Sequence, residues 1–207
     1  DIRLIVDEVK VGFGRTGRMF AFEHSGVVPD VVTMAKPVAS GFPLSAVVAR
    51  REVLDAGVAT HLFTTGGHPV GCAAALATID VIERERLAEN AARVGAWLKT
   101  SLEELKSRCP LIGDVRGQGL IVGVELVRDP VTREPASRET AKVVYRCFEL
   151  GLLVFYVGIH SNVLEITPPL TLTEDEAREG VRLLARALDD VCQGRVPDEK
   201  VARYAGW

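Results

Sequence analysis

The sequence is poor in the residues that build disulfide frameworks and metal sites. Its four cysteines, Cys72, Cys109, Cys147 and Cys192, are scattered and form no Cys-x-x-Cys pair. The four histidines lack the spacing typical of metal ligands. We therefore expect reduced thiols in a cytoplasmic protein, with neither a disulfide framework nor a metal site.

Long apolar runs and a strong charge of one sign are also absent. No stretch approaches the roughly 20 apolar residues of a membrane span, and no signal peptide is recognisable. The formal net charge of -3 favours neither nucleic acid nor an anionic membrane as a partner. With 207 residues, 47% hydrophobic and 26% charged, the sequence predicts a soluble globular protein of one large or two small domains.

The sequence is organised around its first 44 residues, where a charged residue closes each of two apolar runs. Residues 1–8 predict a buried strand ending at Asp7 and Glu8, and residues 31–35 predict a second one ending at Lys36. Ligands of an open parallel sheet bind outside the carboxyl ends of its strands, so Asp7 and Lys36 can meet at one ligand. Pyridoxal 5'-phosphate (PLP) requires such a pair, a lysine for a Schiff base and a carboxylate for its pyridinium nitrogen. The alternatives are a helix cap for Asp7 and a solvated side chain for Lys36.

Several short motifs occur in an order that resembles the class III, fold-type I PLP enzymes, the relatives of ornithine and 4-aminobutyrate aminotransferases. The resemblance covers the whole chain, and the ordered set is specific although no single motif is decisive. The motifs are Asp7-Glu-Val-Lys-Val-Gly-Phe-Gly-Arg-Thr-Gly17, Phe20-Ala-Phe-Glu-His24, Ala35-Lys36, Pro43-Leu44, Thr64-Thr-Gly-Gly-His-Pro69, Gly113-Asp-Val-Arg-Gly-Gln-Gly119 and Pro168-Pro-Leu-Thr171. The resemblance implies an α/β fold in which part of the parallel-sheet PLP domain precedes an α+β C-terminal domain.

The resemblance also implies roles for four residues at the cofactor. Lys36 forms the Schiff base, and Asp7 keeps the pyridinium nitrogen protonated. Val9 packs on one face of the ring, and Thr64 donates to the cofactor phosphate of the neighbouring subunit, which implies a homodimer. Simpler interpretations are an ordinary core residue for Val9 and a turn residue for Thr64.

We expect the chain to divide near Asn90. Residues 1–90 would form the C-terminal portion of the PLP-binding large domain, and residues 91–207 a small α+β domain. Subunits of the family that the sequence resembles are roughly twice this length, and the chain begins inside an expected strand. We therefore expect the N-terminal remainder of the same subunit to complete the site.

Helix and strand signals are strongest after residue 68. The expected elements are a helix opening at Pro69, a helix over residues 87–109, a strand over 119–127, a helix over 138–150 stopped by Gly151, strands over 152–157 and 163–166, and a last helix from the Thr173–Glu176 capping box to about Cys192.

Glu165 departs from the class III aminotransferase pattern. Many of these enzymes have an arginine at this place that clamps the substrate carboxylate. A glutamate would repel a carboxylate and could accept a hydrogen bond from an N–H. We therefore predict a substrate that lacks a free α-carboxylate, such as an amide, a lactam or an amine. The alternative is a solvent-facing side chain on an alternating strand.

Lys10 is a second departure, because the family usually has glutamine at this place. A lysine there could lower the pKa of the ring phenol or exchange protons at the substrate α-carbon. The alternative is a salt bridge with Glu8 or Glu23.

With both departures, the sequence resembles the α-amino-ε-caprolactam racemases, which take cyclic and open-chain amino-acid amides. The resemblance is dense at Glu134-Pro135, Glu139-Thr-Ala-Lys142, Glu149-Leu-Gly-Leu152, Tyr156-Val-Gly158, Asn162-Val-Leu-Glu165, Thr171–Glu176 and the terminal Ala205-Gly-Trp207. It implies loss of the α-proton to a quinonoid carbanion and its return on either face, with Lys36 serving one face and Lys10 a candidate for the other. The alternatives are an aminotransferase acting on an amine or ω-amino acid with a keto-acid acceptor, and a fragment that only folds and dimerises.

Overall fold

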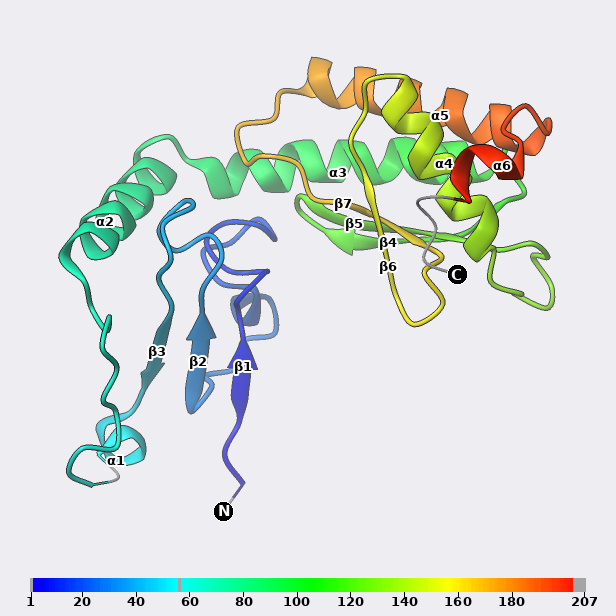
Figure 1. Ribbon diagram of the computed structural model, residues 1–207. Helices are drawn as coiled ribbons and strands as arrows, with labels where there is room; N and C mark the ends of the chain where they lie inside the picture. The colour runs from blue at the N-terminus through cyan, green and yellow to red at the C-terminus, as the bar shows by residue number, and fades with distance from the viewer. Residues whose placement is uncertain (1, 56, 203–207) are drawn as a thin grey trace. The chain divides into compact units, whose positions relative to one another are not determined.

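The computed structural model describes residues 2–55 and 57–202 (Figure 1). They form two compact units, Asp1–Ala92 and Arg93–Trp207. The assignment of these units to a PLP-binding large domain and a small C-terminal domain stays a prediction. The C-terminal Tyr204-Ala-Gly-Trp207 lies outside the described residues.

The first unit contains a three-stranded sheet in the order β1-β2-β3. Its strands are β1 (Ile5–Asp7), β2 (Val31–Met34) and β3 (Ala46–Ala49). β1 and β2 are parallel, as expected, whereas β3 is antiparallel to β2. The sequence did not predict β3, because the apolar run Ala46–Ala49 is too short a signal to separate a strand from a turn.

The prediction that β1 is buried was wrong for the described chain. Ile5 is 63% exposed, and on β3 Val47 and Val48 are 53% and 56% exposed. Among the described residues, no helix packs extensively on this sheet. The apolar run therefore predicted the strand correctly but not the exposure of its side chains in the described chain.

Helices of the first unit follow local signals in the sequence. The longest is α2 (Pro69–Arg84), which begins with proline in its first turn as expected, and His68 accepts a hydrogen bond from the backbone N–H of Gly71 at 3.2 Å. The single-turn elements are η1 (Ala21–His24) and α1 (Arg51–Leu54).

The loop between β1 and η1 is irregular but tightly packed. Phe13 is only 3% exposed, and its ring meets that of Phe20 edge-on with centroids 5.8 Å apart. Gly14 and Gly17 have positive φ angles of 90° and 93°, which glycine adopts without strain. A Cβ at position 17 would also lie 2.9 Å from the Cβ of Ala92. These glycines therefore allow the tight backbone path of the loop.

The second unit is built on an antiparallel sheet in the order β4-β5-β7-β6. Its strands are β4 (Ile112–Gln118), β5 (Ile121–Leu126), β6 (Phe155–Val157) and β7 (Val163–Ile166). β5 and β7 confirm expected strands. β4 was not predicted, because two glycines and two charged residues within it hide the strand pattern.

Helices cover one face of this sheet (Figure 1). They are the C-terminal part of α3 (Leu87–Lys106), α4 (Ser137–Glu149), α5 (Glu174–Cys192) and the short α6 (Asp198–Val201). α4 ends before Gly151, whose φ is 87°, and α5 begins with the expected capping box of Thr173 and Glu176. The fully buried core of the unit includes Leu102, Leu120, Val122, Val124, Leu126, Val143, Leu164, Leu184 and Leu188.

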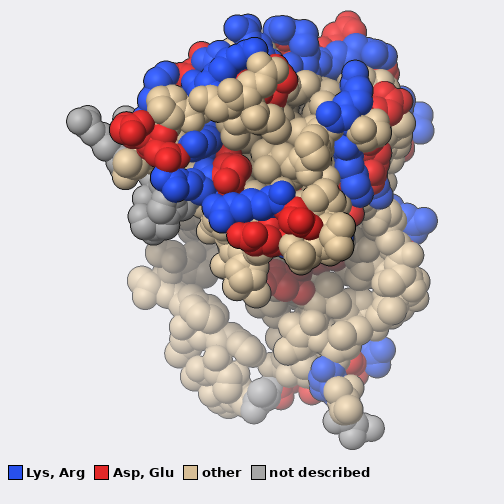
Figure 2. Space-filling view, turned by 90° about the vertical axis from the view of Figure 1, so that its right-hand side faces the viewer, with Lys and Arg blue, Asp and Glu red and all other residues tan. Residues whose placement is uncertain are grey.

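The surface over these helices carries charges of both signs. Figure 2 shows Lys and Arg interspersed with Asp and Glu over the face of the molecule turned toward the viewer. Among the charged residues of α4 and α6, Lys142 pairs with Asp198 at 2.7 Å and Lys200 with Glu149 at 2.9 Å. On this face the charges therefore do not form a patch of one sign.

Candidate active site

Asp7 lies at the carboxyl end of β1 and is exposed. Its Oδ1 accepts a hydrogen bond from the backbone N–H of Val9 at 2.9 Å. Because the following backbone holds one carboxylate oxygen, the orientation of the Asp7 side chain is coupled to the path of the turn after the strand.

Lys36 lies two residues beyond the end of β2 and is exposed as well. In the parallel register, Asp7 is opposite Thr33, so the two strands end at the same edge of the sheet. The structure thus brings Asp7 and Lys36 to one edge through the geometry that the sequence suggested. Their roles toward a cofactor stay predictions.

Val9 and Lys10 form the turn that leaves this edge. Val9 is half-buried, and Lys10 is exposed. Neither position is that of a fully buried core residue. Both follow Asp7 closely enough in the chain for their placement to depend on the same turn.

Glu8, between Asp7 and Val9, has a role that the sequence did not predict. From the sequence it was only a possible salt-bridge partner of Lys10. Glu8 is completely buried, and its two carboxylate oxygens accept hydrogen bonds from the backbone N–H groups of Ala21 and Phe22, at 3.0 and 2.9 Å. The only local signal in the sequence was an acidic residue directly after the strand, which more often indicates solvent exposure.

Thr64 lies in an exposed turn that precedes α2. Gly67 follows in the left-handed region, with φ of 61°, and the chain enters the helix through His68. An exposed hydroxyl in this turn is available to a group outside the unit, which is compatible with both interpretations of Thr64.

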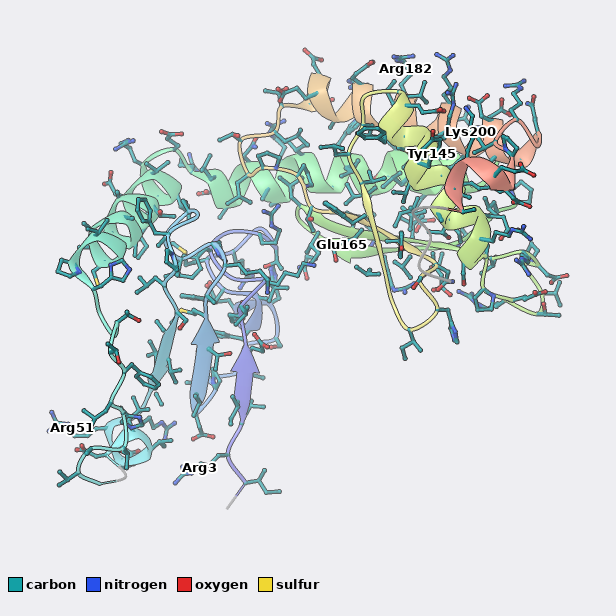
Figure 3. All side chains as sticks on the ribbon, viewed as in Figure 1. Arg3, Arg51, Tyr145, Glu165, Arg182 and Lys200 are labelled. Atoms are coloured by element: carbon teal, nitrogen blue, oxygen red, sulfur yellow. The ribbon has the colours of Figure 1, made fainter. Side chains whose placement is uncertain are left out.

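Glu165 belongs to the second unit, on β7 (Figure 3). Its neighbour Leu164 is fully buried, so alternation places Glu165 on the other face of the strand. Its register partners are Gly123 on β5 and Phe155 on β6, and its Oε1 accepts a hydrogen bond from the Thr167 hydroxyl at 3.2 Å. Because Gly123 has no side chain, the neighbouring strand β5 leaves more space beside the Glu165 carboxylate than a larger residue would.

Glu165 also borders a cavity of about 180 Å³ within the second unit. Most of the other lining residues are apolar, including Leu98, Leu152, Leu172 and Leu184. Leu98 of α3 and Leu184 of α5 are buried core residues, so the cavity lies on the helix-covered side of the sheet, whereas alternation places the Glu165 side chain on the other side.

Comparison with known proteins shows which family the chain belongs to. The family described as aminotransferase class-III matches residues 1–188. The chain belongs to the class III aminotransferase family. Membership implies PLP as the cofactor, and the carboxylate and amine at the edge of the β1–β2 pair fit its two protein requirements.

The similar proteins include both racemases and aminotransferases. The chain is 48% identical over 207 residues to the leucine/methionine racemase of Thermococcus litoralis, covering 100% of the chain and 46% of that protein. It is 50% identical over 176 residues to an Arabidopsis thaliana protein named alanine–glyoxylate aminotransferase 2 homolog 2, mitochondrial, covering 84% of the chain and 36% of that protein. A solved transaminase from the marine bacterium Virgibacillus matches with a TM-score of 0.87 and 38% identity, over 94% of this chain and 46% of that one.

The chain therefore spans less than half the length of the curated relatives it matches. The fold of the described residues is that of the C-terminal part of a fold-type I enzyme. No helix in the described part of the chain is long and apolar enough to cross a membrane.

Proposed function

We propose that the full-length protein is a PLP-dependent racemase of amino-acid amides, including the cyclic amide α-amino-ε-caprolactam. The observation that carries the proposal is Glu165, a carboxylate on β7 where many class III transaminases have a carboxylate-binding arginine. Relatives named as racemases or epimerases support the reaction type. The names of these relatives give free amino acids as substrates, so the proposed preference for amides rests on Glu165.

PLP, when bound, supplies an aldehyde that bonds reversibly to amines and a ring that withdraws electrons from the carbon next to the bound nitrogen. In our proposal the Nζ of Lys36 is the amine that holds the cofactor. Asp7 holds a proton on the ring nitrogen, Val9 packs on one ring face, and Thr64 donates its hydroxyl to the cofactor phosphate of the partner subunit. The proposal therefore includes a homodimer, and the N-terminal remainder of the subunit completes the site.

Glu165 would recognise the substrate by accepting a hydrogen bond from its amide N–H. A charged acceptor strengthens such a bond, and its negative charge disfavours a free carboxylate at the same place.

Inversion at the α-carbon requires proton transfer on both faces, by two groups or by one mobile group. The amine of Lys36 would take or return the proton on one face while the substrate occupies the site. Lys10, in the turn after β1, is our candidate for the second face or for a relay to it. Racemisation follows when the proton returns to the α-carbon and the amino group stays with the substrate.

A second candidate is an aminotransferase acting on an amine or an ω-amino acid. The similarity to aminotransferases, at 50% identity in one relative, favours it. Such an enzyme must also bind a keto-acid acceptor, whose carboxylate needs a cationic partner that Glu165 cannot supply.

We propose a cytoplasmic protein for this activity. All four cysteines are free, and burial raises the pKa of the Cys147 thiol to about 12, so this thiol stays protonated near neutral pH.

Exchanging the charge at position 165 tests the substrate assignment. We expect Glu165→Arg to lower kcat/KM for amino-acid amides about tenfold or more, equivalent to about 1.4 kcal/mol of transition-state binding. An arginine cannot accept the amide N–H and instead pairs with a carboxylate, so turnover of free amino acids should rise relative to amides. The measurement is the ratio of the two kcat/KM values.

A matched control is Glu103→Arg, which makes the same charge change at an exposed position of α3. It should leave both values unchanged. Unaltered amide turnover in Glu165→Arg would show that Glu165 does not contact the substrate.

A further inference from the structure

We propose that Glu8 is a positioning residue of the cofactor site, whose buried carboxylate anchors the loop of residues 9–22 and thereby fixes Asp7 and Val9. The inference rests on the proposed function only through the role of Asp7 at the cofactor. The anchoring itself is a property of the described chain.

The side chain of Glu8 is unusual because a charged residue rarely has no exposed surface. Glu8 is 0% exposed, and its carboxylate is satisfied by main-chain donors. Oε1 accepts from the N–H of Phe22 at 2.9 Å, and Oε2 accepts from the N–H of Ala21 at 3.0 Å. The two oxygens therefore bind the backbone at Ala21 and Phe22, which lie 13 and 14 residues further along the chain.

The backbone of Glu8 ties the same point to two other segments. Its N–H donates to the carbonyl of Thr33 on β2 at 2.9 Å, and its carbonyl accepts from the N–H of Gly12 at 3.1 Å. The residue thus joins the strand edge, the turn and the start of η1 at one position.

Gly12 lies close to Glu8. A Cβ at Gly12 would lie 3.0 Å from the carbonyl oxygen of Glu8 and 3.4 Å from its Oε2. The loop therefore passes closest to the main chain of Glu8, and a side chain at position 12 would press on the Glu8 carbonyl oxygen while only touching the carboxylate.

The anchor acts on Asp7 through the intervening backbone. Asp7 Oδ1 accepts from the N–H of Val9 at 2.9 Å, and Glu8 lies between these two residues. If Glu8 were released, Val9 could move, and the hydrogen bond that orients the Asp7 carboxylate would weaken. A carboxylate held in one orientation is what a fixed contact with a ring nitrogen needs.

The substitution Glu8→Gln tests whether the hydrogen bonds of the carboxylate matter, because it keeps the size of the side chain nearly unchanged. Gln has nearly the same size, but its NH₂ group would face one of the two N–H donors and leave that donor without an acceptor. The matched control is Glu23→Gln, directly after this loop, because Glu23 Oε1 accepts a hydrogen bond from the N–H of Phe20 at 2.7 Å, a local contact within the start of η1.

The experiment compares both variants with the unaltered full-length protein. Hydrogen exchange of peptides covering residues 9–24 is measured without cofactor. The dissociation constant of PLP and the pH dependence of the absorption of bound cofactor are measured next, and the site of attachment is found by borohydride reduction and peptide mass spectrometry.

For Glu8→Gln we expect faster exchange at Ala21 and Phe22, a dissociation constant raised at least tenfold, and a shifted midpoint in the pH dependence of the absorption, with Lys36 still the attachment site. For Glu23→Gln we expect a dissociation constant within twofold of the unaltered protein. If Glu8→Gln fails to fold, Gly12→Ala serves instead, since its methyl group would lie 3.0 Å from the Glu8 carbonyl oxygen and must displace Glu8, and the same shifts should be smaller.

An unchanged dissociation constant and absorption in the Glu8→Gln protein, or equal changes in both variants, would overturn the positioning role. Failure to label Lys36 in the unaltered protein would overturn the proposed function and with it the link to Asp7. Labelled Lys36 without an effect of Glu8→Gln overturns only the positioning role, so the two failures are distinguishable.

Discussion

Single glycines decide where segments of the second unit can approach each other. Gly95, on α3, packs against the turn between β4 and β5, and a Cβ at position 95 would overlap the carbonyl of Gly119. That turn needs glycine itself, because Gly119 has φ of 58°. The helix and the turn can therefore approach each other closely because both contact positions, 95 and 119, are glycine.

We predict that Gly95→Ala destabilises the protein by roughly 1–3 kcal/mol, the usual cost of overpacking. The clash with backbone outweighs the gain of about 1 kcal/mol that alanine brings to a helix. Denaturant unfolding of the variant measures the difference.

Gly180→Ala in α5 provides the comparison. A Cβ there meets only the Cδ1 of Leu152 at 3.9 Å, an ordinary contact, so this variant should be neutral or slightly stabilised. Equal stability of the two alanine variants would contradict the close approach at Gly95.

At the residue scale, the sequence predicted Asp7 and Lys36 because each closes an apolar run, and strand ends are visible locally. Glu8 could not be predicted, because its burial depends on main-chain donors of Ala21 and Phe22 that fold back from a loop without periodic pattern. Contacts across such a loop leave no signal in residue spacing.

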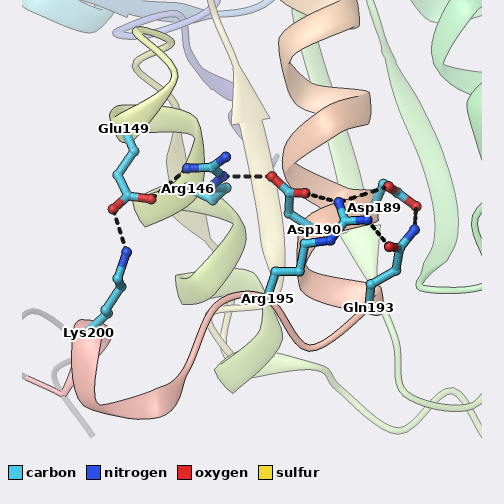
Figure 4. Close-up of polar contacts among 7 residues, drawn as sticks. All are labelled: Arg146, Glu149, Asp189, Asp190, Gln193, Arg195 and Lys200. Atoms are coloured by element: carbon cyan, nitrogen blue, oxygen red, sulfur yellow. Dashed lines mark hydrogen bonds and ion pairs between the residues drawn. The ribbon is translucent and has the colours of Figure 1, made fainter.

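At the scale of elements, a chain of charged contacts joins α4, α5 and α6 (Figure 4). Asp190 on α5, with a side chain only 6% exposed, accepts from Arg195 and, at 2.8 Å, from Nε of Arg146 on α4. Arg146 also pairs with Glu149 at 2.9 Å, and Lys200 of α6 pairs with the same carboxylate at 2.9 Å. Asp190 is the buried member on which this network depends.

We predict that Asp190→Asn lowers the free energy of unfolding by about 2–3 kcal/mol near neutral pH, because one of two charged hydrogen bonds is lost and the other weakened. The hydrogen bond from Arg195 and then that from Arg146 lower the pKa of Asp190 below its ordinary value of 3.8. The stabilisation is therefore present above that value and disappears as the pH falls through the lower pKa of the folded state. Urea unfolding at pH 7 and at decreasing acidic pH should show the difference between variant and parent shrinking.

Asp189→Asn is the matched control, since Asp189 is exposed and its contact with Arg195 is longer, at 3.6 Å. It should change stability by less than about 1 kcal/mol, as exposed pairs do. A loss equal to that of Asp190→Asn would contradict the importance of burial.

Helices were predicted better than strands at this scale. The capping box at Thr173 and the glycine after α4 are local signals, and α5 and α4 follow them. β4 and β3 form because neighbouring strands offer pairing partners, and this information lies outside each segment.

At the scale of the whole molecule, the described chain is part of an architecture known from longer relatives. It spans 46% of the Thermococcus racemase, and the strands of its first unit expose apolar residues such as Ile5 and Val48. The sequence predicted the fold class and cofactor family through ordered motifs, and the comparisons confirm both. Reaction and substrate depend on few residues, chiefly Lys10 and Glu165, and stay predictions.

The most direct test of the proposed reaction uses the full-length protein with PLP and one enantiomer of an amino-acid amide in deuterated water, without a keto acid. We expect deuterium at the α-carbon and loss of optical purity to proceed together over many turnovers. Conversion of the cofactor to its amine form in a single turnover, restarted only by a keto acid, would identify an aminotransferase and contradict the proposed roles of Lys10 and Glu165.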